Sequence, residues 1–239
     1  MEIGGLQKLT LIDFPGRISC TVFVIGCNFR CPFCYASELV LPEKIKKQPR
    51  ISEKDFFKFL EGKKNLLEGV VICGGEPTIN KDLPNFIRKI KKLGYDVKLD
   101  TNGSNPAMLK KLIDKKLIDY VAMDIKGPKE KYSKMTGKKI DIKNIEKSIK
   151  VLKEGKVGFE FRTTIPPNLL KKEDIVKIMR WILSLEPKGF NGQIKYFLQN
   201  FRPEKTIDPK FEKIKPYLQE DLLEIQKAVC PFFEICQIR

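Results

Sequence analysis

Short apolar runs alternate with longer amphipathic stretches along most of this chain. The apolar runs are rich in β-branched and aromatic residues, which is typical of buried strands. They cover Ile18–Ile25, Gly69–Cys73, Asp96–Asp100, Tyr120–Asp124, Val157–Thr164 and Gln193–Gln199. The stretches between them repeat their apolar residues with a helical period, and they cover Ser52–Leu60, Lys81–Leu93, Pro106–Lys115, Asp141–Lys153 and Lys171–Leu185. This alternation predicts an α/β fold with a parallel sheet.

Capping residues mark several of the predicted helix ends. Ser52 opens the first helix, while Gly94 and Gly155 close the second and the fourth. Right-handed crossovers would close such a sheet into a partial (β/α)6 barrel or leave it open and doubly wound, and we expect the partial barrel. The connections are short, so we expect a single domain over residues 1–239, with a core at about 15–200 and a helical tail at 211–239.

Distinctive polar or glycine-rich groups stand at the ends of the predicted strands. In chain order these groups are Gly26–Tyr35, Gly74–Pro77, Asp100–Gly103, Asp124–Lys126, Arg162 and Gln199–Asn200. The carboxyl ends of parallel strands share one edge of the sheet, where β/α proteins build their active sites. The repeated coincidence therefore predicts an enzyme whose active site lies at that edge.

Composition narrows the chemistry that such a site can perform. The chain has no histidine, which excludes Ser-His-Asp triads and His-ligated zinc. It has seven cysteines and neither a secretory leader nor a membrane-length apolar run, so we expect a cytoplasmic protein that uses cysteine for metal or redox chemistry. The net charge of +16 favours acidic partners, and its alternative explanation is a solvated, lysine-rich surface.

The cysteine loop after the first predicted strand is the sharpest single signal. Cys27, Cys31 and Cys34 follow the spacing Cys-x3-Cys-x2-Cys. Three thiolates can hold a 4Fe-4S cluster and leave one iron without a protein ligand, which makes that iron available to a substrate. Two alternatives remain: a zinc site completed by Cys73 or a C-terminal cysteine, and a thioredoxin-like redox pair at Cys31 and Cys34.

The cysteine loop resembles that of the radical S-adenosylmethionine (SAM) superfamily. The segment Gly4–Gly16 resembles, more narrowly, the activating enzymes of anaerobic ribonucleotide reductase and other glycyl radical enzymes. The resemblance extends from about Ile3 to Gln199. It implies a cluster on the three loop cysteines that reductively cleaves SAM to methionine and a 5′-deoxyadenosyl radical. That radical would then abstract hydrogen from a glycine of a partner enzyme.

The resemblance also implies SAM-binding residues at the later strand ends. Gly75 and Glu76, in the Gly-Gly-Glu motif, would pair with the ammonium group of SAM. Asp100 and Lys126 would lie near its methionine moiety. Asn102 would be either a further SAM contact or part of a plain turn with Gly103.

A monovalent cation is implied beside SAM, bound by Asp100, Thr101 and Asp124. Two carboxylates that converge at one sheet edge need a cation between them, or the pKa of one of them rises. Arg162 is a charged residue inside an apolar strand. It would grip the SAM carboxylate in two places, and its alternative role is a buried salt bridge.

Three aromatic and polar positions complete the expected SAM shell. Phe33, Cys34 and Tyr35 would lie against the adenine. Many activating enzymes have His and Asn after the third cysteine, where this chain has Tyr35 and Ala36. That departure weakens the assignment of the substrate without affecting the chemistry. Gln199 stands near a position where some relatives have histidine.

The remaining cysteines and partners follow from position and charge. We expect Cys20 and Cys73 to pack in the core, and Cys230 and Cys236 to be either a structural pair or two unrelated thiols.

The expected partners are a glycyl radical enzyme and an acidic electron donor, flavodoxin or ferredoxin. A small-molecule radical SAM enzyme of the carboxy-deazaguanine synthase type is the alternative. A basic Fe-S or zinc module that binds nucleic acid is the second alternative, although no recognition motif for nucleic acid supports it.

Overall fold

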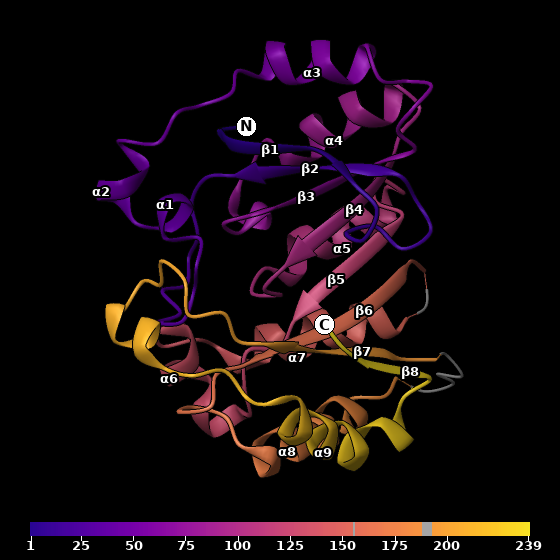
Figure 1. Cartoon of the computed structure of the whole chain (residues 1–239). Helices are drawn as coiled ribbons and strands as arrows, with labels where there is room; N and C mark the ends of the chain where they lie inside the picture. The colour runs from indigo at the N-terminus through magenta and orange to yellow at the C-terminus, as the bar shows by residue number, and fades with distance from the viewer. Residues whose placement is uncertain (155, 188–192) are drawn as a thin grey trace. The chain divides into compact units, whose positions relative to one another are not determined.

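A computed structural model describes residues 1–154, 156–187 and 193–239 (Figure 1). The fold is α/β, and the eight described strands follow one another in chain order in one sheet. The strands are β1 (Ile3–Thr10), β2 (Ser19–Val24), β3 (Gly69–Gly74), β4 (Asp96–Thr101), β5 (Tyr120–Asp124), β6 (Gly158–Ile165), β7 (Lys195–Asn200) and β8 (Ile235–Ile238). β2 pairs with β3, β3 with β4, β6 with β7 and β7 with β8 in parallel, which confirms the mostly parallel sheet.

The first and last strands were not expected from the apolar pattern. β1 pairs antiparallel with β2, with Ile3 opposite Val24. It contains Gly4 and Gly5, which are poor strand formers, so its sequence lacks a strand signal. A Cβ atom at Gly4 would lie 2.5 Å from the side chain of Leu39, which would have to move to make room. β8 ends a tail that was expected to be helical with a cysteine-bearing end, and it is short enough to escape a periodicity test.

The helices between the strands follow the sequence prediction closely. They are α3 (Glu53–Glu61), α4 (Leu83–Lys92), α5 (Pro106–Asp114), α7 (Ile142–Lys153) and α8 (Lys172–Ser184). The Ser52 side chain accepts a hydrogen bond from the backbone N–H of Asp55, as expected of an N-cap. Gly94 follows α4 with φ +92° and donates to the carbonyl of Lys91. Gly155, the other predicted helix end, lies outside the described residues.

Short helical segments fill the remaining connections. These are α1 (Ser37–Val40), α2 (Pro42–Ile45), α6 (Tyr132–Thr136) and α9 (Gln219–Val229), together with the 3-10 turns Pro77–Ile79, Lys129–Lys131, Pro209–Lys213 and Cys230–Phe232. No helix in the described ranges is long and apolar enough to cross a membrane.

The chain forms two compact units, and the first contains Met1–Asn28, Glu38–Thr101 and Ala107–Val121. It holds β1 to β4 and the start of β5. Val22 and Ile72, on the central strands β2 and β3, are completely buried. On α3 and α4, the rings of Phe56 and Phe86 stack with their centroids 5.4 Å apart. This unit therefore has an apolar core of its own, built on the predicted strands and helices.

The second unit contains Phe29–Ser37, Asn102–Pro106 and Ala122–Arg239. It holds the end of β5, the strands β6 to β8, and α6 to α9. α8 and α9 lie side by side (Figure 1). The rings of Tyr132 and Trp181 meet edge to face with their centroids 5.9 Å apart. The cysteine loop from Phe29 onward thus belongs to the unit built by the C-terminal half of the chain.

A disulfide joins Cys230 and Cys236 at the end of the second unit. Of the two interpretations that the sequence left open, the structure therefore has the paired one. The bond links the 3-10 turn after α9 to β8, the strand that pairs with β7. Beyond β8, the guanidinium of Arg239 lies 3.4 Å from the ring centroid of Phe197 and donates to the buried carboxylate of Glu160. The disulfide thus anchors the segment that carries Arg239.

We expect reduction of this disulfide to lower the free energy of unfolding by roughly 2 kcal/mol, because it closes a short loop in the unfolded chain. Urea unfolding of the wild type with and without a thiol reductant measures this difference. The matched control is the Cys230→Ser, Cys236→Ser double variant, which should be insensitive to the reductant. An equal response in that variant would show that the reductant acts elsewhere.

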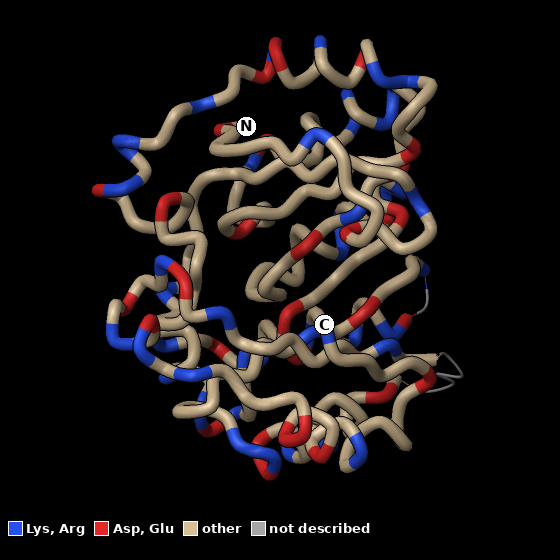
Figure 2. The backbone as a smooth tube through the Cα atoms, in the orientation of Figure 1, with Lys and Arg blue, Asp and Glu red and all other residues tan. Residues whose placement is uncertain are grey.

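Positive charge is spread over the helices and loops of both units, and no single block holds it (Figure 2). This agrees with the distribution of lysines along the sequence. Some basic side chains are engaged in ion pairs: Arg17 donates to Asp96 and Lys177 to Glu130. These pairs are exposed, and each contributes little to stability.

Candidate active site

Backbone hydrogen bonds hold the cysteine loop in place within the second unit. The N–H of Arg30 donates to the carbonyl of Thr136, and the N–H of Ile207 donates to the carbonyl of Cys34. Gly137 lies beside the loop with φ +65°, and a Cβ atom there would come within 2.2 Å of the carbonyl oxygen of Arg30. Only glycine fits this position. These backbone contacts hold the loop without using the thiol groups.

The chemistry of the thiols suits a soft metal centre. Cys31 is buried, Cys27 and Cys34 are half-buried, and none of the three is in a disulfide. In the second unit, burial acts to lower the pKa of Lys126, but Asp124 and, with it, Cys31 and Cys34 raise that pKa. The thiolate is the form of cysteine that binds metal. Among the described residues, no three His, Cys, Asp or Glu side chains surround one metal position, so the cluster ligands remain a prediction.

Glu76 is the centre of a buried hydrogen-bond network in the first unit. Its side chain is 1% exposed, and its Oε1 atom accepts from the backbone N–H of Thr78, 3.0 Å away. The hydroxyl groups of Thr78 and Thr101 donate to the same oxygen, at 2.5 Å and 2.7 Å. Three donors on one oxygen fix the direction of this buried carboxylate. The network ties the end of β3 to the end of β4, which the sequence did not reveal.

The glycines before Glu76 have a structural reason of their own. A Cβ atom on Gly75 would lie 1.9 Å from the carbonyl oxygen of Gly26, and Gly74 has φ +111° beside Val24. The close backbone approach that these glycines permit is therefore to the turn after β2. Their expected contact with SAM remains a prediction, to which this packing adds a second requirement for glycine.

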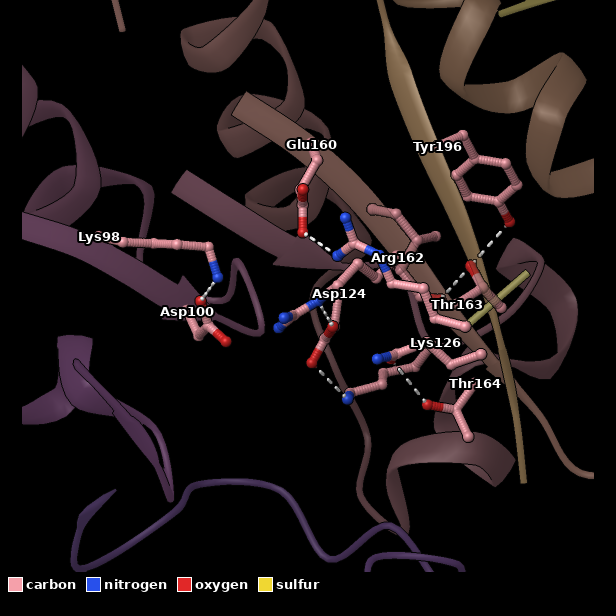
Figure 3. A network of polar contacts seen from close by, with 12 residues as sticks. Lys98, Asp100, Asp124, Lys126, Glu160, Arg162, Thr163, Thr164 and Tyr196 are labelled. Atoms are coloured by element: carbon pink, nitrogen blue, oxygen red, sulfur yellow. Dashed lines mark hydrogen bonds and ion pairs between the residues drawn. The ribbon is translucent and has the colours of Figure 1, made fainter. Parts of the chain in front are cut away.

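Lys98 and Asp100 form a buried ion pair on β4. The Lys98 ammonium lies 2.6 Å from Oδ1 of Asp100, and the two side chains are 2% and 11% exposed (Figure 3). Residues two apart on a strand point to the same face. Lys98 was not among the expected site residues, although this spacing is visible in the sequence.

Asp124 holds two cations in the second unit (Figure 3). Its Oδ1 accepts from Nε of Arg162 and its Oδ2 from the Lys126 ammonium, each at 3.0 Å. Burial acts to raise the pKa of Asp124, but Arg162 and Lys126 outweigh it and hold the pKa at about 2. Arg162 thus forms the salt bridge that the sequence offered as its alternative role, and its contact with SAM stays a prediction. The pair occupies Nε–H, one of five donors on a guanidinium.

The depressed pKa of Asp124 makes its contribution to stability depend on pH. The ordinary pKa is 3.8, so the ionised form stabilises the fold fully above about pH 4, and this stabilisation is lost as the pH falls toward about 2. We expect unfolding free energies measured at stepped pH to fall less steeply over this window in Asp124→Asn than in the wild type. Asp208→Asn, at the N-cap of an exposed turn, is the control. Equal slopes for Asp124→Asn and the wild type would contradict this expectation.

The other expected SAM contacts lie where local structure explains them. The Asn102 side chain accepts from the N–H of Ser104 at 3.0 Å, which is the geometry of a turn. The ring of Phe33 packs on Phe211. Tyr35 is 59% exposed. Gln199 Oε1 lies 3.4 Å from the Thr164 hydroxyl, a long contact. The contacts of Phe33 and Tyr35 with adenine stay predictions, as does a contact of Asn102 with SAM.

Cys20 and Cys73 behave as packing residues. Cys20 on β2 is fully buried, and burial raises the pKa of its thiol to about 12. Cys73 packs on a small cluster of Phe14, Val71 and Tyr120. Both expectations for these residues are confirmed.

Comparison with known proteins identifies the family. The model of the radical SAM superfamily matches residues 21–182, which include most of β2, the cysteine loop and β3 to β6. The chain belongs to the radical SAM superfamily. Enzymes of this superfamily use a 4Fe-4S cluster and SAM, so both are cofactors of this protein. The Cys-x3-Cys-x2-Cys loop fits such a cluster in number and type of donor.

Individual relatives cover most of the chain. A protein of Methanocaldococcus jannaschii, provisionally named a glycyl-radical enzyme activating enzyme, is 32% identical over 99% of this chain and 95% of its own length. The GTP 3′,8-cyclase of Aliarcobacter butzleri is 30% identical over 73% of this radical SAM chain and 53% of its own.

Solved structures support the fold. Streptococcus suis SuiB bound to S-adenosylmethionine matches 92% of this chain with a TM-score of 0.65 and 17% identity. The chain spans about half the length of SuiB, with 51% covered. At this identity the likeness concerns the fold alone, and it agrees with the predicted α/β radical SAM architecture.

Proposed function

We propose that this radical SAM enzyme activates a glycyl radical enzyme by abstracting hydrogen from one of its backbone glycines. The observation that carries the proposal is the 32% identity, over nearly the whole chain, to a protein that bears this provisional name. The Gly4–Gly16 segment, which resembles activating enzymes, supports it from the sequence. The bound cluster and SAM would together supply the 5′-deoxyadenosyl radical that performs the abstraction.

In this proposal, Cys27, Cys31 and Cys34 hold the cluster. Hydrogen bonds from Ile207 to Cys34 and from Asp208 to Pro32 fix the loop and so aim the thiols of Cys31 and Cys34. The role of the surrounding chain is to hold these donors in position before any substrate arrives.

The strand-end groups bind the two charged ends of the methionine moiety of SAM. Glu76, held in direction by Thr78 and Thr101, is the acceptor for the ammonium group. Arg162 is the donor to the carboxylate, and Asp124 orients it through Nε. Gly75, Asp100, Asn102 and Lys126 complete the proposed contacts with the amino-acid portion, and Phe33, Cys34 and Tyr35 those with adenine.

An acidic electron carrier is the proposed source of the reducing electron. The net charge of +16 steers a flavodoxin or ferredoxin toward this protein and speeds its docking at low salt. A rate of cluster reduction by flavodoxin that falls steeply with ionic strength supports this partner. A rate independent of salt would remove the electrostatic basis for it.

The direct test of the function is electron paramagnetic resonance. The reconstituted and reduced enzyme is incubated anaerobically with SAM and each glycyl radical enzyme encoded in the same genome. A glycyl doublet in one partner supports the proposal, and a partner variant with alanine in place of the radical glycine is the control. If SAM is cleaved but no partner acquires a doublet, the activating role is wrong.

A small-molecule substrate is the second candidate. The GTP 3′,8-cyclase of A. butzleri is similar over 73% of this chain, which favours a nucleotide or pterin substrate of the kind used by cyclases and carboxy-deazaguanine synthases. Its test is mass spectrometry of reaction mixtures in which GTP or a pterin replaces the partner protein as the substrate. A new product that forms in step with 5′-deoxyadenosine would favour this candidate over the activating enzyme.

A further inference from the structure

The ion pair on β4 bears on the monovalent cation that the family resemblance implies beside SAM. Such a cation needs carboxylate oxygens that are not already neutralised, and the expected oxygens belong to Asp100 and Asp124. Each of these carboxylates has a fixed protein cation within its own compact unit (Figure 3). The residues present therefore do not fit a bound K⁺ or Na⁺.

On the Asp100 side, the cation is the ammonium group of Lys98. It lies 2.6 Å from Oδ1, the distance of a charge-assisted hydrogen bond. Lys98 is almost completely buried and reaches Asp100 along the same face of β4. Removal of one partner from such a pair leaves the other as a buried, unpaired charge, so Asp100 holds Lys98 in this position.

On the Asp124 side, both carboxylate oxygens are occupied. Oδ1 accepts from Arg162 and Oδ2 accepts from Lys126, each at 3.0 Å. A metal cation at either oxygen would meet two fixed positive charges at close range. The electrostatic repulsion would be strong because these side chains are only 12% to 24% exposed.

We propose that the ammonium group of Lys98 supplies the positive charge at Asp100 that a bound monovalent cation would otherwise supply, so that SAM binding needs no K⁺ or Na⁺. Lys98 is thus a positioning residue that acts through Asp100. The inference rests on the proposed role of Asp100 in binding SAM. It predicts that a neutral residue at 98 recreates a vacancy that K⁺ can fill.

The test compares SAM affinity in choline chloride and in KCl. Calorimetry on the reconstituted full chain with its cluster oxidised avoids sodium dithionite. The Kd of the wild type should be the same in both salts. Lys98→Met should bind SAM about tenfold more weakly in choline chloride, the loss of one charged hydrogen bond, and should recover in KCl. Lys98→Arg, which keeps the charge, is the control and should behave as the wild type.

A second measurement detects binding of the monovalent cation in the absence of SAM. Thallium(I) mimics K⁺, and its nuclear magnetic resonance line should broaden with Lys98→Met but not with the wild type. Thallium binding by the wild type, or a wild-type SAM affinity that rises about tenfold with KCl, would overturn the proposal. So would a folded Lys98→Met variant that ignores K⁺ in both measurements. A wild type that binds no SAM in either salt would instead remove the proposed function, while the thallium result would still decide the role of Lys98.

Discussion

Cys34→Ala is expected to lose both the cluster and SAM cleavage. Two thiolates cannot hold the cube in place of three, and without the cluster no electron reaches SAM. The backbone contact of this residue with Ile207 uses the carbonyl of Cys34 and survives the substitution, so the variant should fold. Iron and sulfide content after anaerobic reconstitution should fall to background, and 5′-deoxyadenosine formation should fall by at least about a thousandfold.

Two cysteines outside the loop provide matched controls for this substitution. Cys20→Ala and Cys73→Ala each remove a thiol from a strand that carries the site. The Cys20 thiol, with its pKa raised to about 12, is a poor metal ligand. Both controls should keep the full iron content. A Cys34→Ala variant that retains cluster and cleavage, or a Cys73→Ala variant that loses them, would contradict the assignment of the ligands.

Arg162→Met is expected to weaken SAM binding by about ten- to a hundredfold. The variant removes a charge-assisted contact with the SAM carboxylate, and contacts of this kind contribute about 1.5–3 kcal/mol. Lys126 still neutralises Asp124 in the variant, so the carboxylate does not remain alone. Calorimetric titration of the reconstituted variant with SAM measures the loss.

Arg239→Met is the matched control for this second variant. Arg239 is also a guanidinium, and it pairs with Glu160 on β6, the strand that carries Arg162. It belongs to no proposed SAM contact. Its loss should lower the melting temperature and leave the Kd for SAM unchanged. If both arginine variants weaken SAM binding equally, Arg162 acts only through the stability of β6.

The sequence predicts the inner strands because their apolar residues are buried on both sides. β5 was predicted with its observed limits, Tyr120–Asp124, and the inner strands β2 to β4, β6 and β7 to within one or two residues. β1 was missed because Gly4 and Gly5 interrupt any alternation, and their use depends on Leu39 and Phe23. Packing between segments that are distant in the sequence cannot be predicted from the local pattern of apolar and polar residues.

Some polar contacts of the site can likewise be predicted from local spacing, and others depend on packing between distant segments. Lys98 and Asp100 are two residues apart on β4, so strand geometry alone could have paired them. Lys126 lies after the end of β5, so its pairing with Asp124 does not follow from strand geometry. The hydrogen bond from Thr101 to Glu76 depends on how β3 and β4 align, which the sequence does not specify. From the sequence, the disulfide between Cys230 and Cys236 was only one of two alternatives for these cysteines.

The most direct test of the central claim is an assay for SAM cleavage. The full chain is reconstituted anaerobically with iron and sulfide, reduced, and incubated with SAM, and its products are separated by chromatography with mass detection. We predict 5′-deoxyadenosine and methionine in equal amounts, formed only when the cluster is present and reduced. A reduced, cluster-loaded protein that leaves SAM intact, both alone and with its candidate substrates, would contradict the claim that this chain is a working radical SAM enzyme.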